Sequence, residues 1–188
     1  MYQKLFLAVV FALITACSPE TYKGTDISNV QWGGDFELTA HTGKRVHASD
    51  FKGKAVVLFF GFTRCPDICA PTLTRLAQAM KLLGADAPQV QVLFISVDPR
   101  HDDPGQLSRF VPTFHPSFLG LTGTEQEITA VAREYRISAQ TDPGHPDQIS
   151  HSGAVLVKDA RGKLRLLIKG EASAEDIAYD LRLILKDG

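Results

Sequence analysis

Two cysteines, Cys65 and Cys69, lie four positions apart and are the side chains of this chain best suited to chemistry. They follow an unbroken apolar run over residues 55–60, which is typical of a strand buried on both faces. A run with helical spacing of apolar residues comes after them. We therefore expect the pair in a turn between a buried strand and a helix that begins near Pro71. Amide N–H groups at such a helix end stabilise thiolates.

The spacing leaves three states open for the pair. Side chains four residues apart on a helix have Cβ atoms roughly 5–6 Å apart, whereas a relaxed disulfide needs about 3.5–4.5 Å. A disulfide would be strained and easily reduced unless Pro66 and Pro71 pull the turn out of helical geometry. One soft metal ion could span two such sulfurs, and two buried structural cysteines are the third interpretation.

Residues 1–17 have the features of an export signal. Lys4 precedes an apolar stretch over residues 5–14, which is shorter than the ~20 residues of a membrane-spanning helix. The run Ile-Thr-Ala-Cys that ends at Cys17 resembles a bacterial lipobox, in which the cysteine is lipidated. We therefore expect an exported protein that is anchored to a bacterial membrane through Cys17, with its domain facing the periplasm. An uncleaved N-terminal anchor is the alternative.

Length and composition predict one domain with no nucleic-acid surface. The chain has 188 residues, 44% of them hydrophobic, and its 20 basic and 21 acidic residues are interspersed. We expect a polar tether over residues 18–32 and a single domain over 33–188. Without Cys17, the chain holds two cysteines, so neither has any other intramolecular disulfide partner. In an oxidising compartment they must pair, bind a metal or be exposed to oxidation.

Strands and helices are expected to alternate along the domain. A glycine turn predicts an N-terminal hairpin over residues 33–46. The other expected strands cover 90–97, 118–121, 153–157 and 164–168, and helices are expected after the capping residues Asp103, Thr124 and Ser173. The polar segment 138–150 is expected to be a long loop. This order predicts an α/β fold in which the cysteine turn and Asp98 emerge at the same edge of the sheet.

The cysteine turn resembles that of the Sco/SenC family of copper-handling, thioredoxin-like proteins. The specific signal is the run Cys-Pro-Asp-Ile-Cys after Phe-Thr, over residues 62–69. Supporting matches occur in the family's order at residues 34–38, 50–54, 96–100, 118–123 and 151–152. The resemblance implies a thioredoxin-like α/β fold with a central mixed sheet flanked by helices and an N-terminal β-hairpin.

The resemblance also implies a function. One copper ion, as Cu(I) or Cu(II), would be bound by Cys65, Cys69 and His151, a soft ligand set that suits Cu(I), although zinc would accept the same groups. The protein would be a copper metallochaperone that assists assembly of the dinuclear copper centre of cytochrome c oxidase. Its partners would be the copper-acceptor domain of that oxidase and an upstream periplasmic copper donor or thiol reductant.

Two aspartates match family positions close to the metal. Asp67 and Asp98 are expected beside the ligands, and the structural alternatives, a helix start for Asp67 and a turn for Asp98, stay equally open. The chain departs from the family at Ser150, where the family usually has an acidic residue before the histidine. The orientation of the His151 ring is therefore not predicted.

Thiol chemistry is the rival interpretation. A thiol-disulfide oxidoreductase would use Cys65 and Cys69 as a redox pair, and a thiol peroxidase would use Cys65 as the thiolate that reacts with peroxide. The Cys-x-x-x-Cys spacing argues against a generic reductase, which has Cys-x-x-Cys. A lipoprotein scaffold whose cysteines merely form a disulfide is the non-redox alternative.

Overall fold

The computed structural model describes residues 21–142, 145–151 and 153–187, and over 139–142 and 145–151 it describes the backbone alone. The expected signal peptide and Cys17 lie outside these residues. The strands are β1 (Thr25–Asp26), β2 (Glu37–Ala40), β3 (Arg45–His47), β4 (Ala55–Gly61), β5 (Val90–Ser96), β6 (Leu119–Thr122), β7 (Ala139–Asp142), β8 (His145–His151), β9 (Val155–Lys158) and β10 (Leu164–Ile168). The α-helices are α1 (Cys69–Leu83), α2 (Pro104–Phe110), α3 (Glu125–Glu134) and α4 (Ala174–Asp187), and the 3-10 helices are η1 (Ala48–Phe51), η2 (Gly84–Gln89) and η3 (Val111–Thr113).

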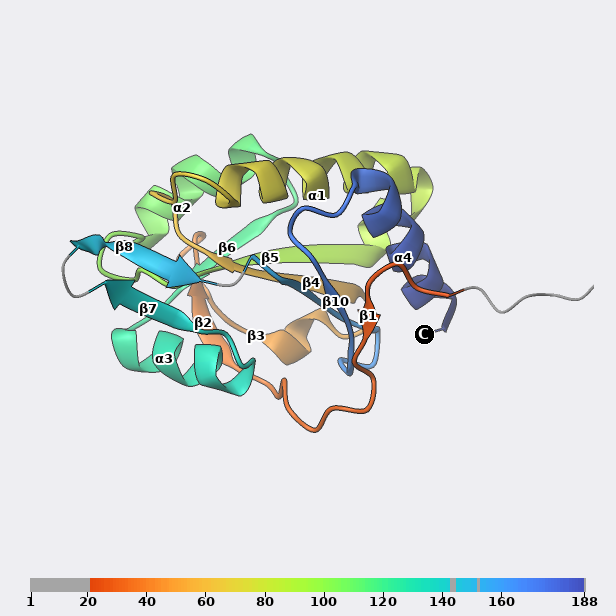
Figure 1. Cartoon of the computed structure of the whole chain (residues 1–188), viewed down its shortest axis with the longest axis horizontal. Helices are drawn as coiled ribbons and strands as arrows, with labels where there is room; N and C mark the ends of the chain where they lie inside the picture. The colour runs from red at the N-terminus through yellow and green to blue at the C-terminus, as the bar shows by residue number, and fades with distance from the viewer. Residues whose placement is uncertain (1–20, 143–144, 152, 188) are drawn as a thin grey trace, which may run out of the picture.

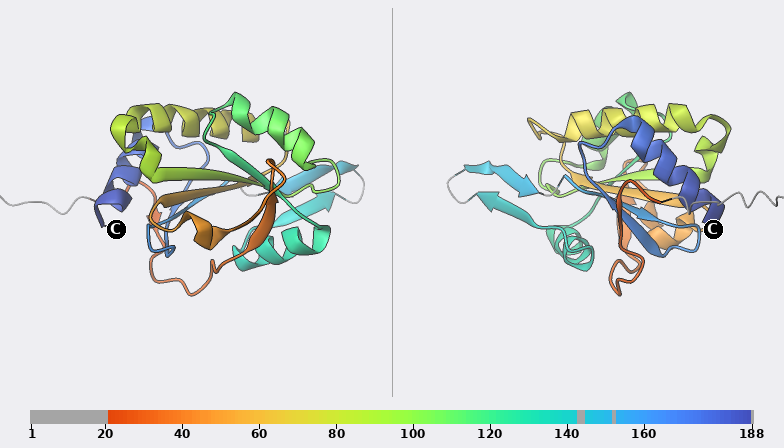
Figure 2. Two further views of the ribbon diagram at one scale, coloured as in Figure 1. Left: turned by 180° about the vertical axis from the view of Figure 1, so that it is seen from behind. Right: turned by 45° about the vertical axis from the view of Figure 1, so that its right-hand side comes forward.

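A mixed sheet forms the centre of the described residues, with the strand order β1-β10-β9-β4-β5-β6-β2-β3. Helices α1, α2 and α4 cover one face, and α3 covers the other (Figure 1). The views in Figure 2 show the same layers from two further directions. The expected thioredoxin-like α/β fold, with helices on both faces and an N-terminal hairpin of β2 and β3, is confirmed.

The central strand β4 is buried along its whole length because both of its faces are covered. Val57 and Phe59 pack into the core beneath α1 and α4, whereas Leu58 and Phe60 pack into the core beneath α3. This alternation is the two-residue period of a strand. On its two sides β4 pairs with β5 in parallel and with β9 in antiparallel orientation.

Local capping signals set the starts of the later helices as expected. The Asp103 side chain accepts a hydrogen bond of 2.7 Å from the backbone N–H three residues on. Thr124 and Glu127 form a reciprocal capping box at α3. The Ser173 hydroxyl accepts a hydrogen bond of 3.1 Å from the first turn of α4. Each side chain satisfies an N–H group that has no partner within its helix.

The segment expected to be a loop over residues 138–150 contains two strands instead. β7 and β8 pair in antiparallel orientation, with Ala139 opposite His151. The prediction of a loop was wrong because a hairpin is stabilised by backbone hydrogen bonds, which a polar sequence without alternating apolar residues also makes.

The expected tether over residues 18–32 is part of the fold from residue 21 onward. β1 pairs with β10, and the backbone N–H groups of Lys23 and Gly24 donate to the buried carboxylate of Asp180, at 2.7 and 2.8 Å. Residues 23–26 of the expected tether therefore contact β10 and α4. No helix within the described ranges is long and apolar enough to cross a membrane.

Candidate metal centre

The cysteine turn lies at the carboxyl edge of the parallel strands. β4 ends at Gly61, which is opposite Ser96 at the end of β5, so the turn and the segment after β5 lie together as expected. α1 begins at Cys69 rather than near Pro71, so only Cys65 lies in the preceding turn. Pro71 is tolerated because an N–H group in the first turn of a helix has no intrahelical partner.

Cys65 is half-buried and is surrounded by hydrogen-bond donors. Burial raises the pKa of its thiol, but donors to the sulfur outweigh that effect and hold the pKa below its ordinary value. These donors are the backbone N–H of Asp67, the thiol of Cys69 and the backbone N–H groups of Cys69 and Ile68. Because α1 starts here, its first amide groups point at the sulfur. Cys65 is therefore the cysteine prepared to be a thiolate.

The pKa of the Cys69 thiol is shifted in the opposite direction. Cys69 is fully buried, and burial raises the pKa of its thiol well above the ordinary value. A hydrogen bond from the backbone N–H of Phe62 lowers the pKa, whereas the nearby sulfur of Cys65 and the carboxylate of Asp102 raise it. Cys69 is thus held as a thiol that donates to Cys65, and a soft metal ion that binds its sulfur would displace the proton.

The sulfur of Cys69 is held in place by close packing against Gly61. A Cβ atom on Gly61 would lie 2.7 Å from the Cys69 sulfur and 2.8 Å from the Phe94 ring. Real Cβ atoms do not approach other atoms this closely, so only glycine fits between the sulfur and the ring. The end of β4 therefore sets the depth of this sulfur.

A buried carboxylate, Asp102, fixes the first residues of the turn. It is fully buried, and it accepts hydrogen bonds from the backbone N–H of Thr63 at 2.9 Å and from the Thr63 hydroxyl at 2.6 Å. The hydroxyl of Ser96 donates a third bond, at 2.6 Å. Hydrogen bonds to a charged group are stronger than neutral ones. Asp102 thus ties the turn after β4 to the end of β5.

The two aspartates that were expected beside the metal differ in exposure. Asp98 is buried, and its carboxylate contacts the guanidinium of Arg64 at 3.2 Å and Nδ1 of His101 at 2.8 Å. The side chain of Asp67 is exposed, although its backbone N–H donates to Cys65. The sequence patterns did not indicate His101 or Asp102 as residues of the site. They lie three and four residues after Asp98 in a helical turn, and this spacing could have indicated that they lie near it.

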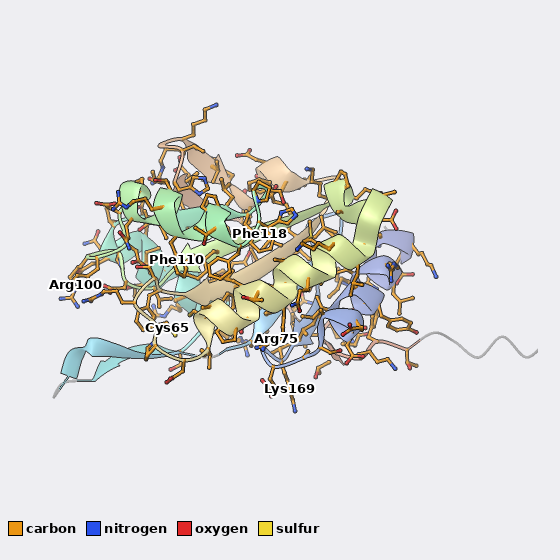
Figure 3. The ribbon with its side chains drawn as sticks, turned by 90° about the horizontal axis from the view of Figure 1, so that it is seen from above. Cys65, Arg75, Arg100, Phe110, Phe118 and Lys169 are labelled. Carbon is orange, nitrogen blue, oxygen red and sulfur yellow. The ribbon has the colours of Figure 1, made fainter. Side chains whose placement is uncertain are left out.

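His151 is the last residue of β8, and its ring lies outside the described side chains. Figures 1 and 3 show from two directions that β8 lies beside the cysteine turn, and Figure 3 labels Cys65 there. Two residues after His151, a Cβ atom on Gly153 would lie 3.2 Å from Cδ1 of Ile68, a residue of the turn. The described side chains alone contain no group of three His, Cys, Asp or Glu residues that could hold a metal ion.

The register of β9 agrees with this placement. Val155 lies opposite Phe59 in the antiparallel pair of β9 with β4. If this register continued by two residues, Gly153 would lie level with Gly61, where the cysteine turn starts. In that register Gly153, two residues after His151, would lie at the edge of the sheet where the cysteine turn starts.

Known proteins match this chain over nearly all of the described residues. The family model described as SCO1/SenC matches residues 24–186. The mitochondrial SCO2 homolog of Mus musculus is 39% identical over 154 residues, which are 79% of this chain and 60% of that protein. The chain thus matches less than two thirds of the length of this relative.

Two solved structures have the same fold. The structure of Bradyrhizobium japonicum ScoI with copper bound has a TM-score of 0.75 and 33% identity, and the match covers 82% of this chain and 99% of that one. A second structure is that of BsSco, which is described as having a disulfide switch and as a member of the Sco family of cytochrome c oxidase assembly proteins. It has a TM-score of 0.68 and 27% identity, and the match covers 81% of this chain and 92% of that one. With a family model matched over most of its length, the chain belongs to the SCO1/SenC family.

Proposed function

We propose that the protein is a copper metallochaperone that binds one copper ion through Cys65, Cys69 and His151. The observation that carries the proposal is the contact between Gly153 and Ile68, because it brings the backbone two residues after His151 against a residue that lies between the two cysteines. The copper-bound structure of a family member supports copper as the cargo.

The donor set fits this metal. Two thiolates and one imidazole form a soft trigonal set that favours Cu(I), and a further ligand would complete a Cu(II) site. The hydrogen-bonded state of Cys65 prepares one thiolate before the metal arrives, whereas the proton of Cys69 leaves when the metal binds. The acceptor of the cargo would be the copper-acceptor domain of cytochrome c oxidase, since another member of the family is described as an assembly protein of that enzyme.

A titration of the reduced chain with Cu(I) tests the ligand set. We expect one tight site, and we expect Cys65→Ser, Cys69→Ser and His151→Ala each to weaken it strongly. His115→Ala is the matched control, because the His115 side chain bonds to Ser117 rather than to the turn. A one-to-one site whose affinity the three ligand variants leave unchanged would refute the proposal.

The same thiols favour a second function, thiol–disulfide exchange. The Cys69 thiol donates to a Cys65 sulfur that has a lowered pKa, which is the arrangement of an attacking thiolate beside a resolving thiol. In this reaction the two thiols become a disulfide while a disulfide of the copper-acceptor domain becomes two thiols, and an upstream periplasmic reductant would restore the pair. Reduction of an oxidised acceptor domain should require both cysteines, and its persistence in the double serine variant would exclude this role. Peroxide consumption by Cys65 alone would instead indicate a thiol peroxidase.

Membrane attachment is proposed from the N-terminal sequence. A lipid on Cys17 would hold the domain at a bacterial membrane, facing the periplasm. Labelling of cells with a radioactive fatty acid should mark the wild-type protein and not Cys17→Ala. Membrane attachment of Cys17→Ala without any label would favour an uncleaved anchor.

A further inference from the structure

The turn between β10 and α4 is held to α1 through one carbonyl group. The carbonyl oxygen of Gly170 accepts hydrogen bonds from Nε of Arg75 at 2.9 Å, from Nη2 of Arg75 at 2.5 Å and from the Thr72 hydroxyl at 3.3 Å. Figure 3 shows Arg75 on the side of α1 that faces the segment with Lys169. The planar fork of arginine can direct two donors at one acceptor, which the single ammonium of lysine cannot do in the same way.

The same glycine lies against the backbone that follows His151. A Cβ atom on Gly170 would overlap the carbonyl oxygen of Gly153, so the two backbones are in direct contact. Gly153 also lies against Ile68 of the cysteine turn. Gly153 therefore contacts both the Gly170 turn and the cysteine turn.

Two residues of extended chain span at most about 7 Å. The position of Gly153 thus limits where the imidazole two residues earlier can reach. Ligand distances in metal sites fall within about 0.2 Å of their standard values. A shift of Gly153 would consequently change the distance between the imidazole and the metal, although none of these glycines is a ligand.

We propose that Arg75 is a positioning residue for His151. It fixes Gly170, Gly170 fixes Gly153, and Gly153 sets the starting point of the segment that presents the imidazole to copper. This inference rests on the proposed ligand role of His151. Only glycine fits at position 170, because a Cβ atom there would overlap the carbonyl group of Gly153.

A double-mutant cycle tests the proposal. The Cu(I) dissociation constants of the reduced chain are measured by competition with a chromophoric Cu(I) chelator for the wild type, Arg75→Met, His151→Ala and the double variant. We expect Arg75→Met to weaken binding about tenfold, as do changes to the groups that orient metal ligands. In the His151→Ala background, Arg75→Met should cause no further loss, because the ligand through which it acts is gone.

Two controls separate positioning from general stability. Arg182→Met removes another arginine that donates to a backbone carbonyl, that of Leu82 at the far end of α1, and should leave copper affinity unchanged. Arg75→Lys keeps the charge and one donor, and should fall between the wild type and Arg75→Met. Urea unfolding of each variant verifies that it is folded at the temperature of the titration.

The electron paramagnetic resonance spectrum of the Cu(II) form supplies a readout that a purely structural role would not change. Nitrogen hyperfine coupling from the imidazole should weaken in Arg75→Met and be absent in His151→Ala. Equal losses of affinity from Arg75→Met in both backgrounds, or no loss in either, would overturn the inference while leaving the ligand set intact. An unchanged affinity in His151→Ala would instead overturn both.

Discussion

Gly61→Ala is expected to weaken copper binding by moving a thiol. The added methyl group would lie 2.7 Å from the Cys69 sulfur, about 0.7 Å inside the 3.4 Å at which ordinary contact begins. The Phe94 ring, at 2.8 Å, blocks the other direction. The sulfur or the ring must therefore shift by several tenths of an ångström.

Such a shift has two costs. Overpacking of a core costs typically about 1–3 kcal/mol of the free energy of unfolding. It also exceeds the roughly 0.2 Å by which ligand distances in a metal site vary, so we expect the Cu(I) affinity to fall about 10- to 100-fold, as when the groups around a ligand are changed. Competition with a chromophoric chelator measures the affinity, and urea unfolding measures the stability.

Gly120→Ala is the matched control for this change. Its methyl group would lie 2.9 Å from Cγ2 of Val111 and 3.1 Å from Cβ of Leu107, so it crowds the same core from strand β6, away from the thiols. It should lower stability to a similar degree and leave the Cu(I) affinity unchanged. Wild-type copper affinity in Gly61→Ala, together with the expected loss of stability, would refute the idea that Gly61 sets the depth of the sulfur.

Four further predictions concern the turn and the N-terminal segment. Asp102→Ala should lower the free energy of unfolding in urea by about 3–5 kcal/mol because three donors lose a charged acceptor, and Asp102→Asn should recover part of this. Iodoacetamide should alkylate Cys65 before Cys69 in peptides analysed by mass spectrometry, because the pKa of Cys65 is lowered and that of Cys69 raised. Cu(I) affinity should rise by at least about tenfold per pH unit between pH 7 and 9, since the raised pKa of Cys69 means that the metal displaces its proton throughout this range; an affinity independent of pH would contradict this. Asp180→Ala should accelerate limited proteolysis of the N-terminal segment because two backbone N–H groups lose their acceptor, and an unchanged rate would show that β1 alone holds it.

The parts of the fold that could be predicted from the sequence are those set by local patterns. Residues close together in the chain predict the buried run of β4 and the capping residues Asp103 and Thr124. The rule that parallel strands end at the same edge of a sheet predicts that the cysteine turn lies beside Asp98. The start of α1 was misplaced by two residues because Pro71 fits any position of the first turn.

The remaining features depend on contacts between distant residues. Asp102 and Asp180 are buried carboxylates that accept hydrogen bonds from backbone N–H groups. These groups lie 39 positions away in the sequence for Asp102 and 156–157 positions away for Asp180. A backbone N–H exists at almost every residue, so no residue type in the sequence marks the partner. The pairing of β7 with β8 escapes prediction for the same reason.

The two halves of the proposed centre are held by different means. The thiols are fixed from within the core, where Gly61 and Asp102 leave the cysteine turn little freedom. The segment that carries His151 joins the domain at Gly153, which contacts Gly170 and Ile68 and is not part of the hydrophobic core. A carrier must hold its cargo and also release it. A rigid pair of sulfurs beside a histidine on a separate hairpin satisfies both requirements, because loss of the imidazole alone would leave the metal on two thiolates with an open position for an acceptor ligand.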